Sequence, residues 1–192
     1  MKWINALKND MLLKARFLSG IPYMYSYTAM EQLIYASIEA RLLTFMNLFT
    51  SLVIIIINDK WGKMKQKGDD ITKKIFKPLL IIETICYGIL VVLYFINRNI
   101  VLFYILNSIM SVLITQNISS CMYYIQQKRY NEDRAEFDIN MTSIGCAIGI
   151  IGYIGATILP PSIEVSFICF YLATVLDNYY QIKVLNETYK CN

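Results

Sequence analysis

The chain has 192 residues, of which 56% are hydrophobic and only 17% are charged, so it is too apolar for a soluble domain of this size. The net charge of +4 does not indicate nucleic-acid binding, because the cations form short clusters between long apolar runs. The absence of histidine excludes a Ser-His-Asp triad, a Cys-His pair and a histidine-ligated metal. We therefore expect an integral membrane protein that binds no metal, no cofactor and no nucleic acid.

Enzyme chemistry has no candidate residues in this sequence. No two of the five cysteines are spaced as CxxC, and four lie in apolar segments, which is typical of small core residues. No nucleophile has a base beside it, and no paired carboxylates lie inside an apolar run. The N-terminus also lacks the short apolar core and small-residue cleavage site of a removable signal peptide. We expect a protein that is not an enzyme and keeps its first helix.

Six stretches approach the length of about 20 mostly apolar residues that a membrane-spanning helix needs. They are expected at residues 13–37, 38–57, 78–96, 100–125, 139–159 and 163–182. The first is the most polar of the six. Pro78 suits the first turn of the third span, and Pro160-Pro161 end the fifth. The sequence thus predicts an all-α bundle of six transmembrane helices in a single domain, residues 1–192.

The connections between these spans differ in length and charge. Those at residues 58–77 and 126–138 are long and charged, whereas those at 97–99 and 160–162 are short. All but two of the 18 cations, Arg41 and Arg98, fall on the side of the long connections and the two termini. The positive-inside bias predicts that this side is cytoplasmic, in a multi-pass protein of the cell (plasma) membrane.

The segment after the second span reads Asn58-Asp59-Lys60-Trp61-Gly62-Lys63-Met64-Lys65. Asp59 can accept backbone N–H bonds at a helix start, Gly62 permits a tight turn, and the lysines can face anionic headgroups. An ordinary basic loop that follows the charge bias would explain the same residues.

The order acidic, basic, any, Gly, basic, any, basic resembles the signature loop of the major facilitator superfamily of secondary transporters. Its members here are Asp59, Lys60, Gly62, Lys63 and Lys65. The stretch Glu132-Asp133-Arg134-Ala135 is similar to the start of the fifth helix in that family. The resemblance implies a bundle equivalent to one half of such a transporter, with these loop residues and Arg134 in a cytoplasmic gate.

Three features depart from the family pattern, and one of them is that the fifth span lacks the proline frequent in antiporter members, with Tyr153 and Ile154 following Gly152. Ile55 stands where the signature loop usually opens with glycine, and the fourth span lacks the arginine common in proton-coupled members. The fifth span, in contrast, resembles the glycine-rich fifth helix of the family through Gly145, Gly149, Gly152 and Gly155.

The glycine spacing has a physical meaning of its own. Gly145, Gly149 and Gly152 lie within roughly 60° of one another on a helix, and in lipid such small residues let another helix approach closely. We expect these residues and Gly155 to form a helix-packing seam, which is either static or moves during transport.

Glu31 is the one carboxylate that the expected spans place away from a cytoplasmic end. It needs a cavity or a partner if it lies in hydrocarbon; if the helix ends early, it lies instead at the outer interface. The candidate substrate path consists of the hydrogen-bonding side chains Tyr23, Tyr27, Glu31, Gln32, Asn107, Gln116 and Asn117. Tyrosines that form interface belts and amides that bond between helices would explain them equally.

The leading interpretation is a transporter-like protein that moves a small solute by alternating access. Six spans form only one half of such a transporter, so we expect a homodimer or a half-length partner, and the one-sided charge favours a parallel homodimer. The alternative is a non-transporting accessory, immunity or scaffolding membrane protein with the same bundle.

Overall fold

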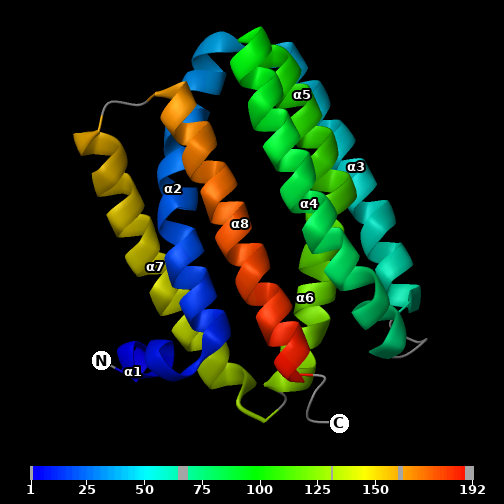
Figure 1. Cartoon of the computed structure of the whole chain (residues 1–192). Coiled ribbons are helices and arrows are strands. Elements are labelled where there is room, and N and C mark those ends of the chain that lie inside the picture. The colour runs from blue at the N-terminus through cyan, green and yellow to red at the C-terminus, as the bar shows by residue number, and fades with distance from the viewer. Residues whose placement is uncertain (1, 65–68, 131, 160–161, 189–192) are drawn as a thin grey trace. The chain divides into compact units, whose positions relative to one another are not determined.

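The computed structural model describes residues 2–64, 69–130, 132–159 and 162–188 (Figure 1). Within these ranges the side chains of residues 2, 31, 32, 35, 62–64 and 69–73 are not described. The elements in the described ranges are all helices: α1 Lys2–Asn9, α2 Met11–Ser37, α3 Ala40–Met64, α4 Asp69–Asn97, α5 Ile100–Met110, the π-helical turn η2 Ser111–Thr115, α6 Gln116–Arg129, α7 Arg134–Ile158 and α8 Ile163–Thr188.

Four of these stretches are long and apolar enough to cross a bilayer. They are Ala40–Trp61, Lys74–Asn97, Ile100–Arg129 and Arg134–Ile158, found in a search of the described residues. The all-α class predicted from composition is confirmed, and the four helices indicate a membrane protein. The two predicted spans outside this set, 13–37 and 163–182, fall in α2 and α8, where tyrosines, amides and carboxylates lower the hydropathy.

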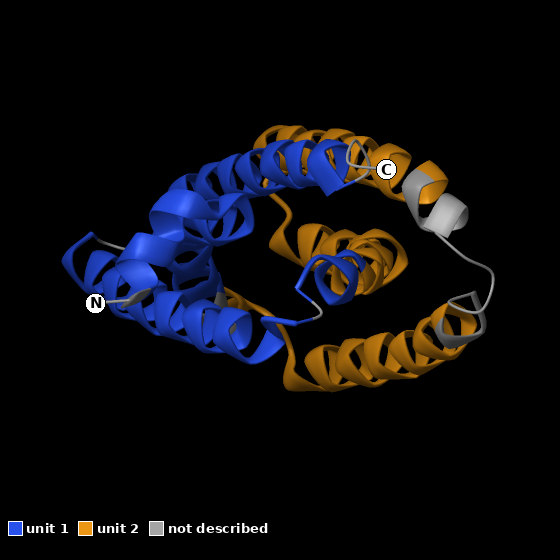
Figure 2. Ribbon diagram, turned by 90° about the horizontal axis from the view of Figure 1, so that it is seen from below, with its two compact units in different colours: residues 1–33, 125–192 blue, residues 34–124 orange. Residues whose placement is uncertain are grey.

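The helices form two compact units (Figure 2). One unit comprises residues 1–33 and 125–192, and therefore holds α1, α7, α8, most of α2 and the end of α6. The other comprises residues 34–124, with α3, α4, α5, η2 and the start of α6.

Two connections predicted as long loops are largely helical. α3 runs on to Met64 and α4 begins at Asp69, so the predicted loop 58–77 is wrong, and Pro78 lies inside α4 rather than in its first turn. The loop predicted at 126–138 is likewise shortened by α6 and α7. Helices can continue past the apolar region because lysine favours helix and water solvates the polar side chains there. The short connection at 97–99 is confirmed.

α2 and α7 run parallel and approach closely at two glycines. An added Cβ would lie 2.6 Å from Ile148 Cδ1 at Gly20, and 2.5 Å from Met24 Cβ at Gly152. Each glycine thus accommodates a side chain of the other helix, one turn apart. Gly155 faces Tyr25, at 3.7 Å from the ring.

The other two glycines of the predicted seam are open. A Cβ added at Gly145 or at Gly149 would meet nothing within 4 Å among the residues that the structure describes. The structure therefore places Gly152 and Gly155 against α2, and it adds Gly20, which the sequence analysis did not include.

α8 packs antiparallel to α2. Ser19 Oγ lies 3.2 Å from Asp177 Oδ1 and donates to it, and Gln181 Nε2 donates to Asp177 Oδ2 at 2.5 Å. One turn further along α2, the Tyr23 ring lies 6.0 Å from that of Phe170. Polar side chains of these two helices are therefore turned toward each other.

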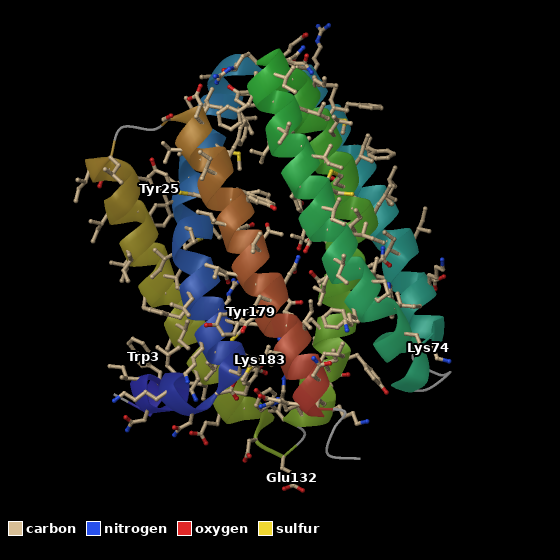
Figure 3. The ribbon with its side chains drawn as sticks, viewed as in Figure 1. Trp3, Tyr25, Lys74, Glu132, Tyr179 and Lys183 are labelled. Atoms are coloured by element: carbon tan, nitrogen blue, oxygen red, sulfur yellow. The ribbon has the colours of Figure 1, made fainter. Side chains whose placement is uncertain are left out.

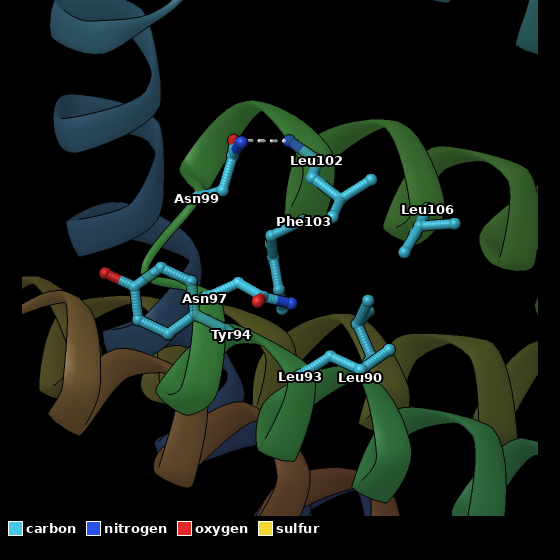
Figure 4. Close-up of a pocket in the computed structure, with 8 residues that line it drawn as sticks. All are labelled: Leu90, Leu93, Tyr94, Asn97, Asn99, Leu102, Phe103 and Leu106. Carbon is cyan, nitrogen blue, oxygen red and sulfur yellow. Dashed lines mark hydrogen bonds between the residues drawn. The ribbon is translucent and has the colours of Figure 1, made fainter.

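In the second unit, α4 and α5 form an antiparallel pair joined by a tight turn. Asn99 caps α5, because its Oδ1 accepts from Leu102 N at 3.0 Å, and the rings of Tyr94 and Phe103 pack edge to face at 5.9 Å. A small pocket at this turn (Figure 4) is lined by Leu90, Leu93, Tyr94, Asn97, Asn99, Leu102, Phe103 and Leu106. Its mostly apolar lining offers packing rather than chemistry.

We predict that Gly152→Ala destabilises the protein by about 1–3 kcal/mol, because the new methyl group would overlap Met24 Cβ and the neighbouring backbone. The matched control is Gly149→Ala, which adds the same methyl group in open space on the same helix and gains helix propensity. Thermal unfolding in detergent compares the two variants. Equal effects of both substitutions would contradict the assigned α2–α7 contact.

Candidate functional site

Glu83 is a buried carboxylate inside an apolar helix of the second unit. Its exposed fraction is 5%, and it lies near the middle of the candidate span Lys74–Asn97. Thr115 Oγ1 donates a hydrogen bond of 2.6 Å to Glu83 Oε1. Since a carboxylate in hydrocarbon is costly unless it has a partner, this bond is the centre of the candidate site.

Thr115 is the last residue of η2, which interrupts the long helix between α5 and α6. The backbone N–H of Gln116 bonds to Ser111 O, five residues back. Such π-turns shift the side chains that follow them around the helix axis, and they occur frequently at functional sites. The turn lies near the middle of the candidate span Ile100–Arg129, at a position comparable to that of Glu83 in its own span.

Tyr87 extends the hydrogen bonding by one turn of α4. Its hydroxyl lies 3.3 Å from Thr115 Oγ1. Because Thr115 has a single hydroxyl proton and donates it to Glu83, Tyr87 is the donor in this second bond. The result is a relay of hydroxyl groups that ends on the carboxylate.

The two residues after Thr115 bond to α3. Gln116 Nε2 donates to Asn58 Oδ1 at 3.1 Å, and Trp61 Nε1 donates to Asn117 Oδ1 at 2.6 Å. Asn58 and Trp61 share a helix face because they are three residues apart. Asn117 Nδ2 also donates to the carbonyl of Leu113, in the π-turn, at 2.7 Å.

We call this set of side chains the polar junction. Its members are Asn58, Trp61, Glu83, Tyr87, Thr115, Gln116 and Asn117. Three consecutive residues, 115–117, bond to two different helices, so the junction fixes α3 and α4 against the helix that contains the π-turn.

The predicted substrate path is divided between the two units. Gln116 and Asn117 belong to the polar junction, and Asn107 lies in α5, where its Oδ1 is buried without a hydrogen-bond partner among the described residues. In the first unit, Tyr23 and Tyr27 stack along α2 with ring centroids 6.2 Å apart. Glu31 and Gln32 lie in α2, but their side chains are outside the described ones.

The predicted gate residues lie on two helices. Asp59 and Lys60 are exposed within α3, so Asp59 is not at a helix start. Gly62 and Lys63 are also within α3, without a described side chain, and the tight turn predicted at Gly62 is wrong. Lys65 is outside the described residues. Arg134 begins α7, and its Nε donates to Asp138 Oδ2 of the same helix at 3.0 Å.

Five members of the junction were missed from the sequence. The expected span 78–96 places Glu83 near a cytoplasmic helix end, whereas the candidate span begins four residues earlier, at Lys74. Asn58 and Trp61 were assigned to a loop, so their common helix face was not considered. A threonine and a tyrosine within apolar helices do not by themselves indicate a site, although Thr115 directly precedes the polar pair Gln116 and Asn117. Tyr87 has no such neighbours in the sequence.

The junction contains one carboxylate among neutral hydroxyl, amide and indole groups. Such a set can accept hydrogen bonds from a proton-carrying or cationic group, but it offers no nucleophile with an adjacent base. In the described part of the chain, no three Cys, Asp or Glu side chains gather as a metal site would require.

No family model, no curated protein and no solved structure matches this chain.

We predict that Thr115→Val destabilises the protein by about 1–3 kcal/mol, because the isosteric valine removes the hydroxyl that donates to the buried Glu83. Thr115→Ser, which keeps the hydroxyl, serves as the matched control and should retain most of the stability. Thermal unfolding of the purified variants in detergent measures both. A valine variant as stable as the serine variant would show that the bond does not stabilise Glu83.

Proposed function

We propose that the chain is a transporter-like membrane protein that moves a small, positively charged solute or ion by alternating access, with Glu83 as the binding carboxylate. The observation that carries this proposal is the burial of Glu83 in the middle of an apolar helix, bonded to Thr115. Ionisable residues inside membrane spans are rare and typically mark substrate or ion pathways.

The arrangement of the polar junction supports a path rather than an isolated bond. The Glu83–Thr115 pair lies near the middle of two candidate spans, whereas Trp61, bonded to Asn117, is the last residue of the span Ala40–Trp61. Polar groups thus extend from mid-membrane toward one end of the helices. A carboxylate at this depth of a span favours a cation over an anion as the solute.

We further propose six membrane spans, adding α2 and α8 to the four apolar stretches. At about 1.5 Å per residue both helices are long enough. The exposed side of α8 is apolar, with Val165, Ile168, Leu172, Leu176 and Tyr179 spaced as one helical stripe. Its polar residues Asn178 and Gln181 are buried. This pattern, apolar outside and polar inside, is what lipid requires.

Six spans place both termini on one side of the membrane, and the bias of lysine and arginine favours the cytoplasmic side of the cell (plasma) membrane. The bundle then corresponds to one half of a major facilitator superfamily transporter, as the motif resemblance implies. A parallel homodimer, or a half-length partner, would supply the second half, and the segment with Asp59 and Lys60 would act at the cytoplasmic gate.

A non-transporting accessory, immunity or scaffolding protein is the second candidate. The observation that favours it is the continuous helix α3, which includes the signature-loop residues Asp59 and Gly62, where a hinge loop was expected.

We predict that Glu83→Gln abolishes transport while leaving the protein folded, because the amide keeps the shape of the side chain but not its charge. The purified protein would be reconstituted into liposomes on a solid-supported membrane. Currents would then be recorded on concentration jumps of sodium, choline and tyramine, with glucose and lactate as neutral and anionic solutes.

The expected result is a current for at least one cation in the wild-type protein and none in Glu83→Gln. The control is Glu164→Gln, because Glu164 lies in the first turn of α8 outside the polar junction. An undiminished current in Glu83→Gln would overturn the role of Glu83. A folded wild-type protein that is silent for every cation would favour the accessory protein.

A further inference from the structure

The short helix α1 separates polar from apolar residues around its axis. At 100° per residue, Trp3, Ile4, Ala6 and Leu7 occupy one side, and Lys2, Asn5, Lys8 and Asn9 occupy the other. Trp3, Ala6 and Leu7 are half-buried, whereas Ile4 is 39% exposed and Lys8 is exposed. Since Ile4 and Lys8 are one turn apart, an apolar and a basic side chain share the free edge of the helix.

Hydrogen bonds to Asp10, which lies between α1 and α2, fix the orientation of α1. Asp10 caps α2, because its Oδ1 accepts from Leu12 N at 2.8 Å and from Leu13 N at 3.2 Å. Its other oxygen, Oδ2, accepts from the hydroxyl of Tyr130 at 2.5 Å. The Tyr130 ring in turn stacks on Phe137 of α7, with centroids 3.9 Å apart.

The Tyr130 hydroxyl is held as a donor at this contact with Asp10. Burial, and then the Asp10 carboxylate that accepts its proton, raise the pKa of the Tyr130 hydroxyl well above its usual range. The phenol therefore remains a donor. α1 contacts α7 and runs across the ends of α2 and α7 (Figure 1); Trp3 lies at the same end of its unit as Glu132 and Lys183 (Figure 3).

Residues 2–16, which comprise α1 and the start of α2, carry more basic than acidic side chains. The cations are Lys2, Lys8, Lys14 and Arg16, and Asp10 is the one acidic residue. Both oxygens of Asp10 are engaged by the helix cap and by Tyr130, while Lys8 and Lys14 are exposed. Basic residues beside an exposed apolar edge are complementary to an anionic lipid surface.

We propose that α1 and the first turn of α2 form an interfacial segment that binds anionic lipid headgroups, with Lys8 of α1 and Lys14 of α2 contacting the phosphates and with Ile4 and Trp3 at the boundary of the acyl chains. The inference does not depend on transport. It depends on the fixed crossing of α1 over the ends of α2 and α7, on the exposed edge of Ile4 and Lys8, and on the exposed cations Lys8 and Lys14.

Quenching of the fluorescence of Trp3 tests the proposal, because the sequence contains only two tryptophans. The protein would be placed in nanodiscs of phosphatidylcholine with a minor fraction of phosphatidylglycerol. In one sample the phosphatidylglycerol carries brominated acyl chains, and in the other an equal mole fraction of the phosphatidylcholine carries them. Bromine quenches tryptophan at short range. The difference between wild type and Trp3→Phe isolates the signal of Trp3 from that of Trp61.

We expect brominated phosphatidylglycerol to quench Trp3 about twofold to fivefold more than an equal fraction of brominated phosphatidylcholine, since each lysine attracts anionic lipid. The preference should disappear in the double variant Lys8→Gln, Lys14→Gln. It should persist in Lys74→Gln, which removes an exposed lysine of α4.

Equal quenching by the two brominated lipids would overturn the proposal, as would a preference that survives in the double variant. If that variant does not fold, a salt series on the wild-type protein decides. A preference that falls with ionic strength supports headgroup binding by exposed cations, and a preference that is independent of salt contradicts it.

Discussion

The rest of the second unit depends on the hydrogen bond from Thr115 to Glu83, because a buried carboxylate needs a partner inside the protein. In a bilayer a polar group cannot turn to water for a partner, so it must find one inside the protein. Glu83 finds a threonine hydroxyl at 2.6 Å, and that hydroxyl is itself 3.3 Å from Tyr87. The π-turn supplies the position: it ends at Thr115, and the next two side chains hold α3 through Asn58 and Trp61.

The same constraint explains the first unit. Asp177 of α8 is bonded to Ser19 and Gln181, so the polar residues that lower the hydropathy of α2 and α8 face each other. The outer stripe of α8 is apolar in consequence. Between α2 and α7, in contrast, Gly20 and Gly152 allow the two helices to approach closely. Polar bonds between helices and close contact at small residues thus add to the packing of buried apolar side chains in each unit.

The long helices were predictable from the sequence, because runs of apolar residues determine them directly, whereas α1 and the π-turn were not. The ends of the long helices were not predictable either. α3 continues through Gly62 to Met64, and Pro78 does not start α4, because proline is tolerated inside a long helix whose neighbours compensate. Because the expected span began at Pro78, Glu83 was not recognised as lying near the middle of an apolar helix. Gln116 and Asn117 were found because amides in the middle of an apolar run are conspicuous. Their partners Asn58 and Trp61 were not, since pairing between distant helices leaves no local pattern.

The central claim is that the polar junction lies inside the membrane and lines a solute path that opens to water during alternating access. It is tested most directly by the reactivity of single cysteines introduced at positions 115 and 113, in a background without the five native cysteines. The two positions belong to one π-turn, but Thr115 bonds to Glu83 whereas Leu113 is 55% exposed at the surface. A small, membrane-impermeant cationic thiol reagent should label Thr115→Cys and leave Leu113→Cys unmodified in liposomes. Labelling at 113 with none at 115 would contradict the account.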